Sequence, residues 1–305
     1  EGKNFVQTNL VAEVANSYYE LQALDNQLLI IKQNIALQKS ALEIVKLQKE
    51  AARGTELAVQ KFEAEVLKSQ SLEFDINQNI KETENKINFL LGRFPQEISR
   101  DRGSVLSIVP QVVASGIPSQ LLINRPDIKQ AELELAAAKL DVKVARAEFF
   151  PSLGISAGVG YNAFKASYLF KFPASLLYSL AGDLAAPLIN RNAIKAEFSS
   201  ANARQIQALY NYQRVILVAF LEVSNQLSRI DNLEKSYTLK AKQVAALDKS
   251  IAVSNDLFKS ARVDYFEVLM TQRDALETKL ELIDTKRDQL NAMVTVYRNL
   301  GGGWR

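Results

Sequence analysis

The chain has 305 residues, 48% of them hydrophobic, and its 37 basic and 34 acidic residues leave a net charge of only +3. Charges of both signs are mixed along the chain, which is typical of solvated helix faces and argues against a nucleic-acid partner. Cysteine and histidine are absent, so thiolate or imidazole metal sites and Ser-His or Cys-His catalytic pairs are excluded. No phosphate-binding glycine loop follows a predicted strand either, so we expect neither an enzyme nor a bound cofactor.

Two long segments of the chain, 10–92 and 219–301, match each other without a gap at a constant offset of 209 residues. Matching positions include Glu13 with Glu222, Asn16 with Asn225, Ala52 with Ala261, Leu67 with Leu276 and Gly92 with Gly301. A register kept over about 83 positions predicts two long helical hairpins packed side by side, because each turn must meet its counterpart at the same height.

The first copy carries a heptad pattern. Apolar residues recur every seven positions at Val14, Leu21, Leu28, Ile35 and Leu42. This spacing predicts a helix over about 4–52 that packs as a left-handed coiled coil. A turn is expected at 52–55, where a glycine or a short polar residue suits a turn or a helix N-cap. A second helix over 56–91 should then end at Gly92.

A proline- and glycine-containing segment, 93–125, follows the first copy and predicts an irregular connection. Arg125-Pro126-Asp127 then opens a helix, because proline suits the first helical turn and aspartate favours the positive end of the helix dipole. This helix is expected to end at Phe149-Phe150-Pro151.

The period of the apolar residues changes from 3.6 to 2 after Pro151, which predicts two β-strands, at 152–161 and 174–185. Apolar residues alternate with glycine and serine in the first strand. The second alternates more loosely, because Leu177 and Gly182 fall on the wrong faces. The loop between the strands carries Tyr168, Phe170 and Phe172 beside lysines, a composition typical of a membrane surface, with packing within the loop as the alternative role of the rings.

The second copy has the same heptad pattern as the first. Its apolar positions are Val223, Ile230, Tyr237, Val244, Ile251 and Phe258. Its first helix is predicted to begin near Asn192, which makes it roughly 70 residues and about 100 Å long. A turn at 261–264 and a helix that ends at Gly301 complete the second hairpin.

Five short motifs form a recognisable combination. They are Arg125-Pro126-Asp127-Ile128, Ala145-Arg146-Ala147-x-Phe149-Phe150-Pro151-Ser152, Ala186-Pro187-Leu188, Tyr265-Phe266-Glu267-Val268-Leu269 with Gln272-Arg273, and Leu300-Gly301-Gly302-Gly303-Trp304. Together, and in this order, they resemble the outer-membrane factor family, the TolC-type exit channels of tripartite efflux pumps and type I secretion systems. The resemblance covers essentially the whole chain.

The resemblance implies a mainly α fold with a membrane β-barrel part. Three protomers would form a helical tunnel, an α-barrel of duplicated antiparallel hairpins, and a twelve-stranded outer-membrane barrel to which each gives four strands. The implied domains are a first periplasmic hairpin lacking its N-terminal part (1–92), an equatorial connection (93–125), a helix leading to the barrel (126–150), an outer-membrane β-hairpin (151–186), a second periplasmic hairpin (187–300) and a C-terminal segment (301–305). Since only two strands are predicted, the other pair, and the lipid-modified cysteine of many members, are expected upstream of Glu1.

The function implied is passive export. A homotrimer in the bacterial outer membrane, in contact with its lipid and extending into the periplasm, would receive substrate from an inner-membrane transporter through a periplasmic adaptor. The C-terminal Leu-Gly-Gly-Gly-Trp favours the efflux branch, with a type I secretion channel as the alternative. A soluble coiled-coil scaffold or adaptor is an alternative of another class, which explains the heptads but not the alternating strand at 153–161.

The family's channels close just after the second hairpin turn, where efflux members have Tyr-Leu-x-x-Leu-Asp-Ala-Gln-Arg. By that motif Phe266 matches the hydrophobic ring and Arg273 the basic partner, while Met270 stands at the aspartate position. We therefore expect an apolar constriction of Phe266 and Met270, since bulky side chains around a narrow axis block flow. Asp264 and Glu267 are nearby residues that could supply charge instead, and plain packing within the hairpin is the alternative role for Phe266 and Met270.

Two further groups of residues have a functional and a plain interpretation. The turn residues Arg53, Gly54, Thr55, Arg262 and Val263 are either ordinary turn residues or the tip that contacts the adaptor. Asp183 is expected on the lumen side of its strand, either as a plain solvated residue or as a selectivity element of the channel.

Overall fold

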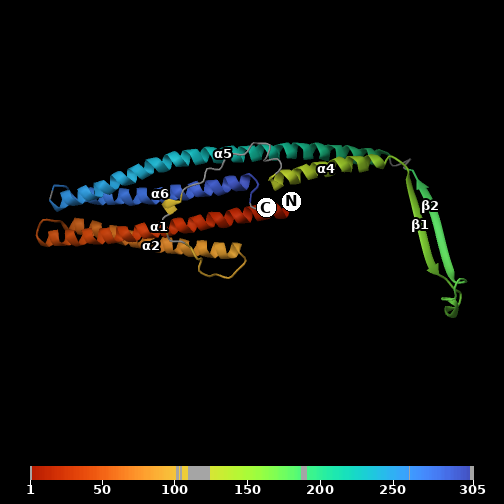
Figure 1. Ribbon diagram of the computed structural model, residues 1–305, viewed down its shortest axis with the longest axis horizontal. Helices are drawn as coiled ribbons and strands as arrows, with labels where there is room; N and C mark the ends of the chain where they lie inside the picture. Colours follow the sequence, from red (N-terminus) through yellow and green to blue (C-terminus); the bar gives the residue numbers. More distant parts are fainter. Residues whose placement is uncertain are drawn as a thin grey trace. The chain divides into compact units, whose positions relative to one another are not determined.

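The computed structural model describes residues 2–100, 103, 105–108, 124–186, 191–260 and 262–302. Several features of interest therefore lie outside the described residues, namely 109–123 of the predicted connection, Ala261 of the second turn, Pro187 and Leu188 of the third motif, and Gly303 and Trp304 of the last. The chain forms two compact units, one of Glu1–Pro126 with Val218–Arg305 and the other of Asp127–Leu217. Figure 1 labels their helices and strands.

The first unit contains two helical hairpins. Helices α1 (Gly2–Glu50) and α2 (Glu56–Leu90) form one hairpin. The other consists of α6 (Tyr265–Asn299) and the part of α5 (Arg191–Lys259) from Val218 onward. Helix α1 packs against both α2 and α6, and a short 3-10 helix, η1 (Val105–Ser107), contacts α1 and α6. The predicted pair of hairpins and the 69-residue helix that opens the second are confirmed.

The repeat seen in the sequence is also present in the backbone. Helices α2 and α6 both have 35 residues, and they begin 209 positions apart. Each ends at a glycine with positive φ, 66° at Gly92 and 82° at Gly301. In both copies the amide of the next residue donates to the carbonyl oxygen four positions before the glycine, at 3.0 Å. This left-handed cap satisfies carbonyls that the helix end leaves unpaired, so both copies stop at the same point for the same reason.

The heptad positions of α1 form the core of the first unit. Leu21 is fully buried, Ile35 and Leu42 are buried, and Val14 and Leu28 are partly buried, because α1 has a neighbouring helix on two sides. The corresponding residues of α5, from Ile230 to Phe258, are only partly buried in the single chain. The seam predicted from the heptads is therefore confirmed for α1 and is less complete for α5.

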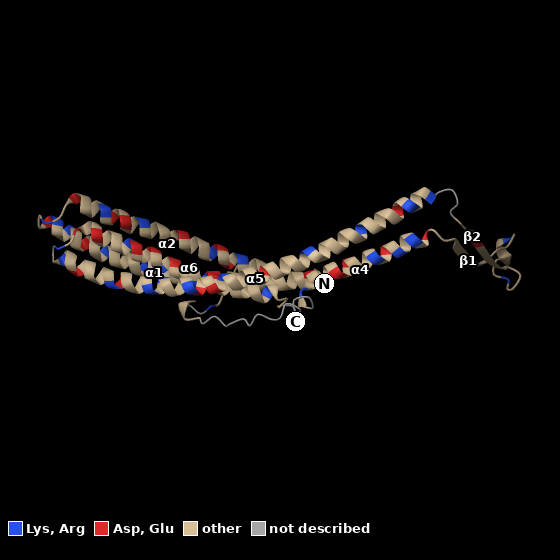
Figure 2. Ribbon diagram, turned by 90° about the horizontal axis from the view of Figure 1, so that it is seen from above, with Lys and Arg blue, Asp and Glu red and all other residues tan. Residues whose placement is uncertain are grey.

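The seam between α1 and α6 is partly polar. Gln38 and Gln272 are 0% and 1% exposed, yet their side-chain amides have no hydrogen-bond partner among the described residues. Gln27 of α1 donates to Asp284 of α6 at 2.9 Å. Figure 2 shows basic and acidic residues interspersed along these helices, as the mixed charge of the sequence predicts.

The second unit contains α4 (Pro126–Ala147), a β-hairpin and the first part of α5. Strands β1 (Ser152–Tyr161) and β2 (Leu176–Ala185) pair in antiparallel register from Ser152 with Ala185 to Tyr161 with Leu176. The sequence predicted the first strand correctly but began the second two residues too early. Ser175 belongs instead to the loop, because its carbonyl accepts from Asn162 N at 2.8 Å and its amide donates to Lys171 O at 3.1 Å.

The register gives the β-hairpin two different faces. One face carries the apolar residues Leu153, Ile155, Ala157, Val159 and Tyr161 of β1 with Leu176, Tyr178, Leu180, Gly182 and Leu184 of β2. The other carries only glycine, serine, alanine, Asp183 and Leu177. Because both faces are exposed in the single chain, this apolar face has no covering element among the described residues.

No α-helix in the described part of the chain combines the length and the apolar character that crossing a membrane requires.

Candidate functional site

The two hairpin turns lie together at one end of the first unit (Figure 1). Val45 of α1, Phe62 of α2 and Val268 of α6 belong to one buried cluster, and Phe258 of α5 and Tyr265 of α6 pack against it. Four helices therefore contribute to one core directly behind the turns. We call this group the tip cluster; it consists of Ala41, Leu42, Val45, Ala58, Val59, Phe62, Val66 and Val268 with Phe258, Tyr265 and Leu269.

The first turn is closed by backbone hydrogen bonds and a side-chain cap. Arg53 N donates to Gln48 O at 2.8 Å. Thr55 caps α2, because its hydroxyl accepts from Ala58 N at 3.2 Å, as the sequence predicted for a short polar residue here.

Gly54 of the first turn does not adopt the left-handed conformation that glycine often adopts at such positions. Ala52 does so, with φ of 57°. Gly54 instead has little room for a side chain, since a Cβ at this position would lie 3.1 Å from the backbone nitrogen of Lys49. The two residues thus divide between them the roles that a single glycine often combines.

A charged pair spans the first turn. Lys49, in the last turn of α1, forms an ion pair with Glu56 in the first turn of α2, and Gln60 Nε2 donates to Glu56 at 2.9 Å. The hydrogen bond from Lys49, followed by that from Gln60, lowers the pKa of the Glu56 carboxyl below its ordinary value. Both charged side chains are exposed, so solvent screens the pair.

The second turn repeats the backbone of the first. Arg262 N donates to Leu257 O at 2.9 Å, at positions 209 residues after Arg53 and Gln48. Asp264 occupies the N-cap position of α6, with φ of −76° and ψ of 154°, but its side chain makes no capping hydrogen bond. Among the residues predicted for the tip, Arg53, Thr55 and Arg262 are exposed, whereas Gly54 and Val263 are partly buried.

The predicted gate residues share one face of α6. Phe266, Met270 and Arg273 are spaced by four and then three residues, which aligns them along the helix. Phe266 is 56% exposed and lies outside the tip cluster, Met270 is partly buried and Arg273 is exposed. The neighbouring Tyr265, Val268 and Leu269 point into the cluster instead. Glu267, also predicted for the site, is exposed in the first turn of α6.

The same face of α6 continues into a groove against α2. It has a volume of about 530 Å³ and is lined from α2 by Glu65, Lys68, Ser69, Ser71, Leu72 and Asp75, and from α6 by Arg273, Leu276, Glu277 and Leu280. Arg273 is thereby placed near charges of both signs. Glu65 of α2 lies in this groove only because of how the hairpins pack, which sequence patterns do not predict.

A buried ion-pair network ties the connecting segment to the first hairpin. Arg100 Nη1 donates to Glu84 of α2 at 2.7 Å and Nη2 donates to Asp25 of α1 at 3.0 Å. The hydrogen bond to Asp25, more than that to Glu84, raises the pKa of Arg100. The sequence analysis missed this network, because its partners are 75 and 16 positions apart in the chain.

Two of the family-like motifs meet at one junction. Arg125 is buried, and its Nη1 donates to Glu222 at 2.8 Å and to the carbonyl of Asn299 at 3.2 Å. A Cβ on Gly301 would lie 2.6 Å from the carbonyl carbon of Asn124. Within the first unit these contacts therefore hold residues 124–125 against α5 and the end of α6, which is a structural role.

Asp183 lies on the small-residue face of the β-hairpin, directly opposite Gly154. A Cβ on Gly154 would approach the Asp183 carboxyl carbon to 2.9 Å, so the glycine leaves the space that the carboxylate occupies. Asp183 itself is exposed. In the described ranges, no group of three or more carboxylates could hold a metal ion.

The chain is similar to known proteins over its whole length. Residues 117–302 match the family model described as "Outer membrane efflux protein". The chain is 31% identical over 301 residues to the pyoverdine export outer membrane protein OpmQ of Pseudomonas aeruginosa, covering 98% of this chain and 63% of that protein. It is 28% identical over 308 residues to the cation efflux system protein CusC of Escherichia coli, covering 100% of this chain and 66% of that protein. The chain thus spans less than two thirds of the length of these relatives.

Solved structures agree with this result. The outer-membrane channel OprN matches 99% of this chain and 68% of its own, with a TM-score of 0.90 and 25% identity. A structure of CusC matches with the same TM-score and 26% identity, over 99% of this chain and 70% of its own. The arrangement of duplicated helical hairpins and a β-hairpin is therefore one that these channels share.

Proposed function

Because the chain belongs to the outer membrane efflux protein family, we propose that it forms part of a passive exit channel of a tripartite efflux pump. Membership places it in the bacterial outer membrane and decides against the soluble scaffold. The relatives are channel and efflux proteins rather than enzymes. For this chain the proposal is that it conducts its cargo without any chemical step.

The observation that carries the proposal is the two-faced β-hairpin. Its strands have 10 residues each, within the length of about 9–11 that a tilted strand needs to cross a bilayer. The exposed apolar face fits hydrocarbon, and the face of small residues with Asp183 fits a water-filled lumen. In the proposed homotrimer the hairpin is one part of a closed barrel, which leaves no strand edge unpaired.

The helical hairpins are proposed to line a periplasmic tunnel. Their turns meet at one end around the tip cluster, which would present Arg53, Thr55 and Arg262 to a periplasmic adaptor bound to an inner-membrane transporter. Relatives of this chain are named for the export of pyoverdine, cations and toluene. A tunnel wall need not recognise its cargo, so we propose that the transporter selects it.

The gate is proposed to be apolar. Phe266 is exposed on α6 just beyond the turn, outside the tip cluster, and Met270 follows one helical turn later. Three copies of this pair around a narrow axis would exclude water and ions by size and by dewetting. Asp264, Glu267 and Arg273 would then surround the constriction as charged residues.

Single-channel recording tests both proposals. The full-length trimer in planar bilayers should conduct rarely, and the double substitution Phe266→Ala with Met270→Ala should raise its open probability. Leu57→Ala with Lys61→Ala, at the equivalent positions of α2, is the matched control and should leave the open probability nearly unchanged. A full-length trimer that conducts in none of these forms would contradict the channel, and equal effects of both double variants would contradict the gate.

A further inference from the structure

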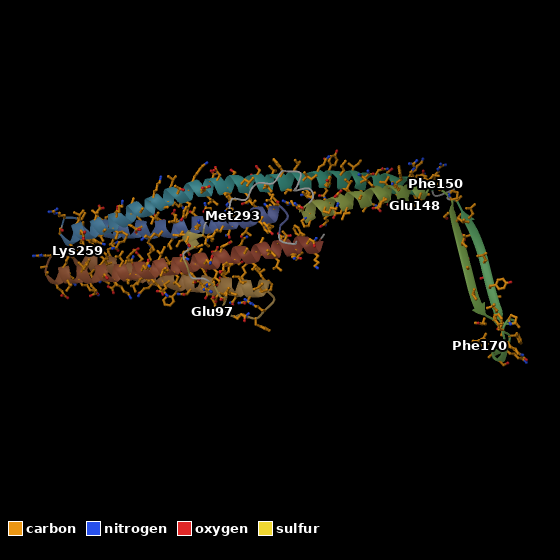
Figure 3. All side chains as sticks on the ribbon, viewed as in Figure 1. Glu97, Glu148, Phe150, Phe170, Lys259 and Met293 are labelled. Carbon is orange, nitrogen blue, oxygen red and sulfur yellow. The ribbon has the colours of Figure 1, made fainter. Side chains whose placement is uncertain are left out.

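The loop between β1 and β2, residues 162–175, is folded but turns its aromatic rings outward. Asn162 N donates to Ser175 O at 2.8 Å, which closes the loop, and a 3-10 helix, η2 (Ala166–Tyr168), lies within it. Nevertheless Phe164, Phe170 and Phe172 are each at least 74% exposed. Figure 3 shows Phe170 at the end of the β-hairpin that is remote from Phe150, where α4 leads into β1.

The loop is also basic. It contains Lys165 and Lys171 and no acidic residue. The Lys171 ammonium lies 5.0 Å from the centre of the Tyr168 ring, and neither lysine forms an ion pair within the described part of the chain. Both positive charges are therefore available to an external anion.

Each lysine has aromatic neighbours. Phe164 precedes Lys165, and Phe170 and Phe172 flank Lys171. The ring of Tyr161, on the apolar face of β1, lies 5.9 Å from that of Phe170. The aromatic surface thus continues from the apolar strand face into the loop, so a membrane that covers the strands would place the lysines at the depth of its headgroups.

We propose that this loop binds anionic phosphate headgroups of the outward-facing lipid leaflet, with Lys165 and Lys171 pairing with the phosphates while the aromatic rings enter the headgroup boundary. The inference rests on the proposed function, which places the β-hairpin in the outer membrane. The chemistry is that of basic residues next to a membrane, where each lysine adds electrostatic attraction to an anionic surface. The rings fix the depth of the loop, and the lysines distinguish anionic from zwitterionic lipid.

Competitive lipid retention tests the assignment. The full-length trimer in a neutral detergent is offered equal amounts of phosphatidylglycerol and phosphatidylcholine, and native mass spectrometry gives the ratio of the two lipids retained. Lys165→Gln with Lys171→Gln should lower this ratio by about fivefold for each lysine. Lys165→Arg with Lys171→Arg should preserve it. The control is Lys139→Gln with Lys143→Gln on an exposed face of α4, which should also preserve it.

An unchanged ratio in the Lys→Gln loop variant would overturn the proposal, and so would an equal fall in the α4 control. Phe170→Ser with Phe172→Ser should reduce retention of both lipids together, and a fall confined to phosphatidylglycerol would contradict the assignment of charge recognition to the lysines. Conductance of the same preparations in phosphatidylcholine bilayers separates the two proposals. If the trimer conducts but the Lys→Gln loop variant has an unchanged lipid ratio, the channel proposal stands and the lipid site is contradicted. If the trimer does not conduct but the variant lowers the ratio, the lipid site stands and the channel proposal is contradicted.

Discussion

The two hairpin turns have the same backbone but are held by different side chains. At the first turn Lys49 pairs with Glu56 across the turn. At the positions 209 residues later, Phe258 and Tyr265 pack against the tip cluster. Both turns therefore pack on the tip cluster, but the first adds a polar contact of its own, while the second depends on a core that the first hairpin largely supplies. The comparison teaches that equivalent backbone hydrogen bonds can define the same turn in both copies even where the side chains around the turn make different contacts.

Removing the centre of the tip cluster should have the largest effect. Phe62 is fully buried, so Phe62→Ala should lower the free energy of unfolding by about 4 kcal/mol, from lost burial and the cavity left behind. Since the second turn depends on this cluster, hydrogen exchange at the amide of Arg262 should rise more than at that of Arg53. Phe74→Ala, on an exposed face of α2, is the control and should change stability by less than about 0.5 kcal/mol. Equal exchange at both turns would contradict the comparison.

The two capping glycines should differ when each is replaced by alanine. Gly301→Ala must adopt a positive φ and also meets the backbone of Asn124, so it should cost about 3 kcal/mol. At Gly92 a Cβ meets nothing within 4 Å, so Gly92→Ala should cost only the conformational term of about 1 kcal/mol. Urea unfolding of both variants measures the difference. Equal losses of unfolding free energy in the two variants would show that the backbone at Asn124 moves to accommodate the added Cβ without strain.

The N-cap residues of α2 and α6 should differ by a smaller amount, and here the larger loss of stability is expected in the first copy. Thr55→Ala removes a capping hydrogen bond and should cost about 1 kcal/mol. Asp264 makes no such bond, so Asp264→Ala should cost only a few tenths of a kcal/mol through the helix dipole. Thermal unfolding of the two variants tests this order, and a larger loss for Asp264→Ala would reverse it.

The smallest expected effect is on the stability of the protein at acidic pH. The pKa of Glu56 is lowered in the folded state by Lys49 and Gln60. Its ionised carboxylate therefore stabilises the folded protein above the unfolded-state pKa, and this stabilisation is lost as the pH falls through the folded-state pKa. Lys49→Gln should therefore flatten the part of the stability profile below about pH 4.5. The second turn has Phe258 and Tyr265 at these positions, so Phe258→Leu should leave that acid limb unchanged. Chemical unfolding across this range measures both profiles.

The helices and strands could be predicted from the sequence because heptads and strand alternation are local, periodic patterns. The heptads of α1 predicted the buried Leu21, Ile35 and Leu42, and the alternation after Pro151 predicted both faces of the β-hairpin. Phe266, Met270 and Arg273 were assigned to the candidate gate by the resemblance to the family's motif, and their spacing puts them on one face of α6. These conclusions need only the geometry of a single helix or strand.

Features that depend on distant partners could not be predicted in this way. Arg100 stands in an irregular segment, and nothing beside it in the sequence points to Asp25 or Glu84. The left-handed conformation of Ala52 could not be predicted, because a glycine stands two residues later and is the usual residue for that conformation. The buried amides of Gln38 and Gln272 break the apolar pattern that the heptads suggest. In each case the decisive interaction is made by tertiary packing.

The equal length of α2 and α6 restricts how the molecule can evolve. Because both helices have 35 residues and end in the same cap, shortening one hairpin alone would draw its turn away from the tip cluster. A tolerated change must remove the same length from both arms of both hairpins. It must also come in steps of seven residues, about 10 Å of helix, to keep the heptads in phase. The length of the helical hairpins can therefore change only in fixed steps. Relatives with longer or shorter hairpins should carry four matched insertions or deletions, one in each arm, rather than a single one.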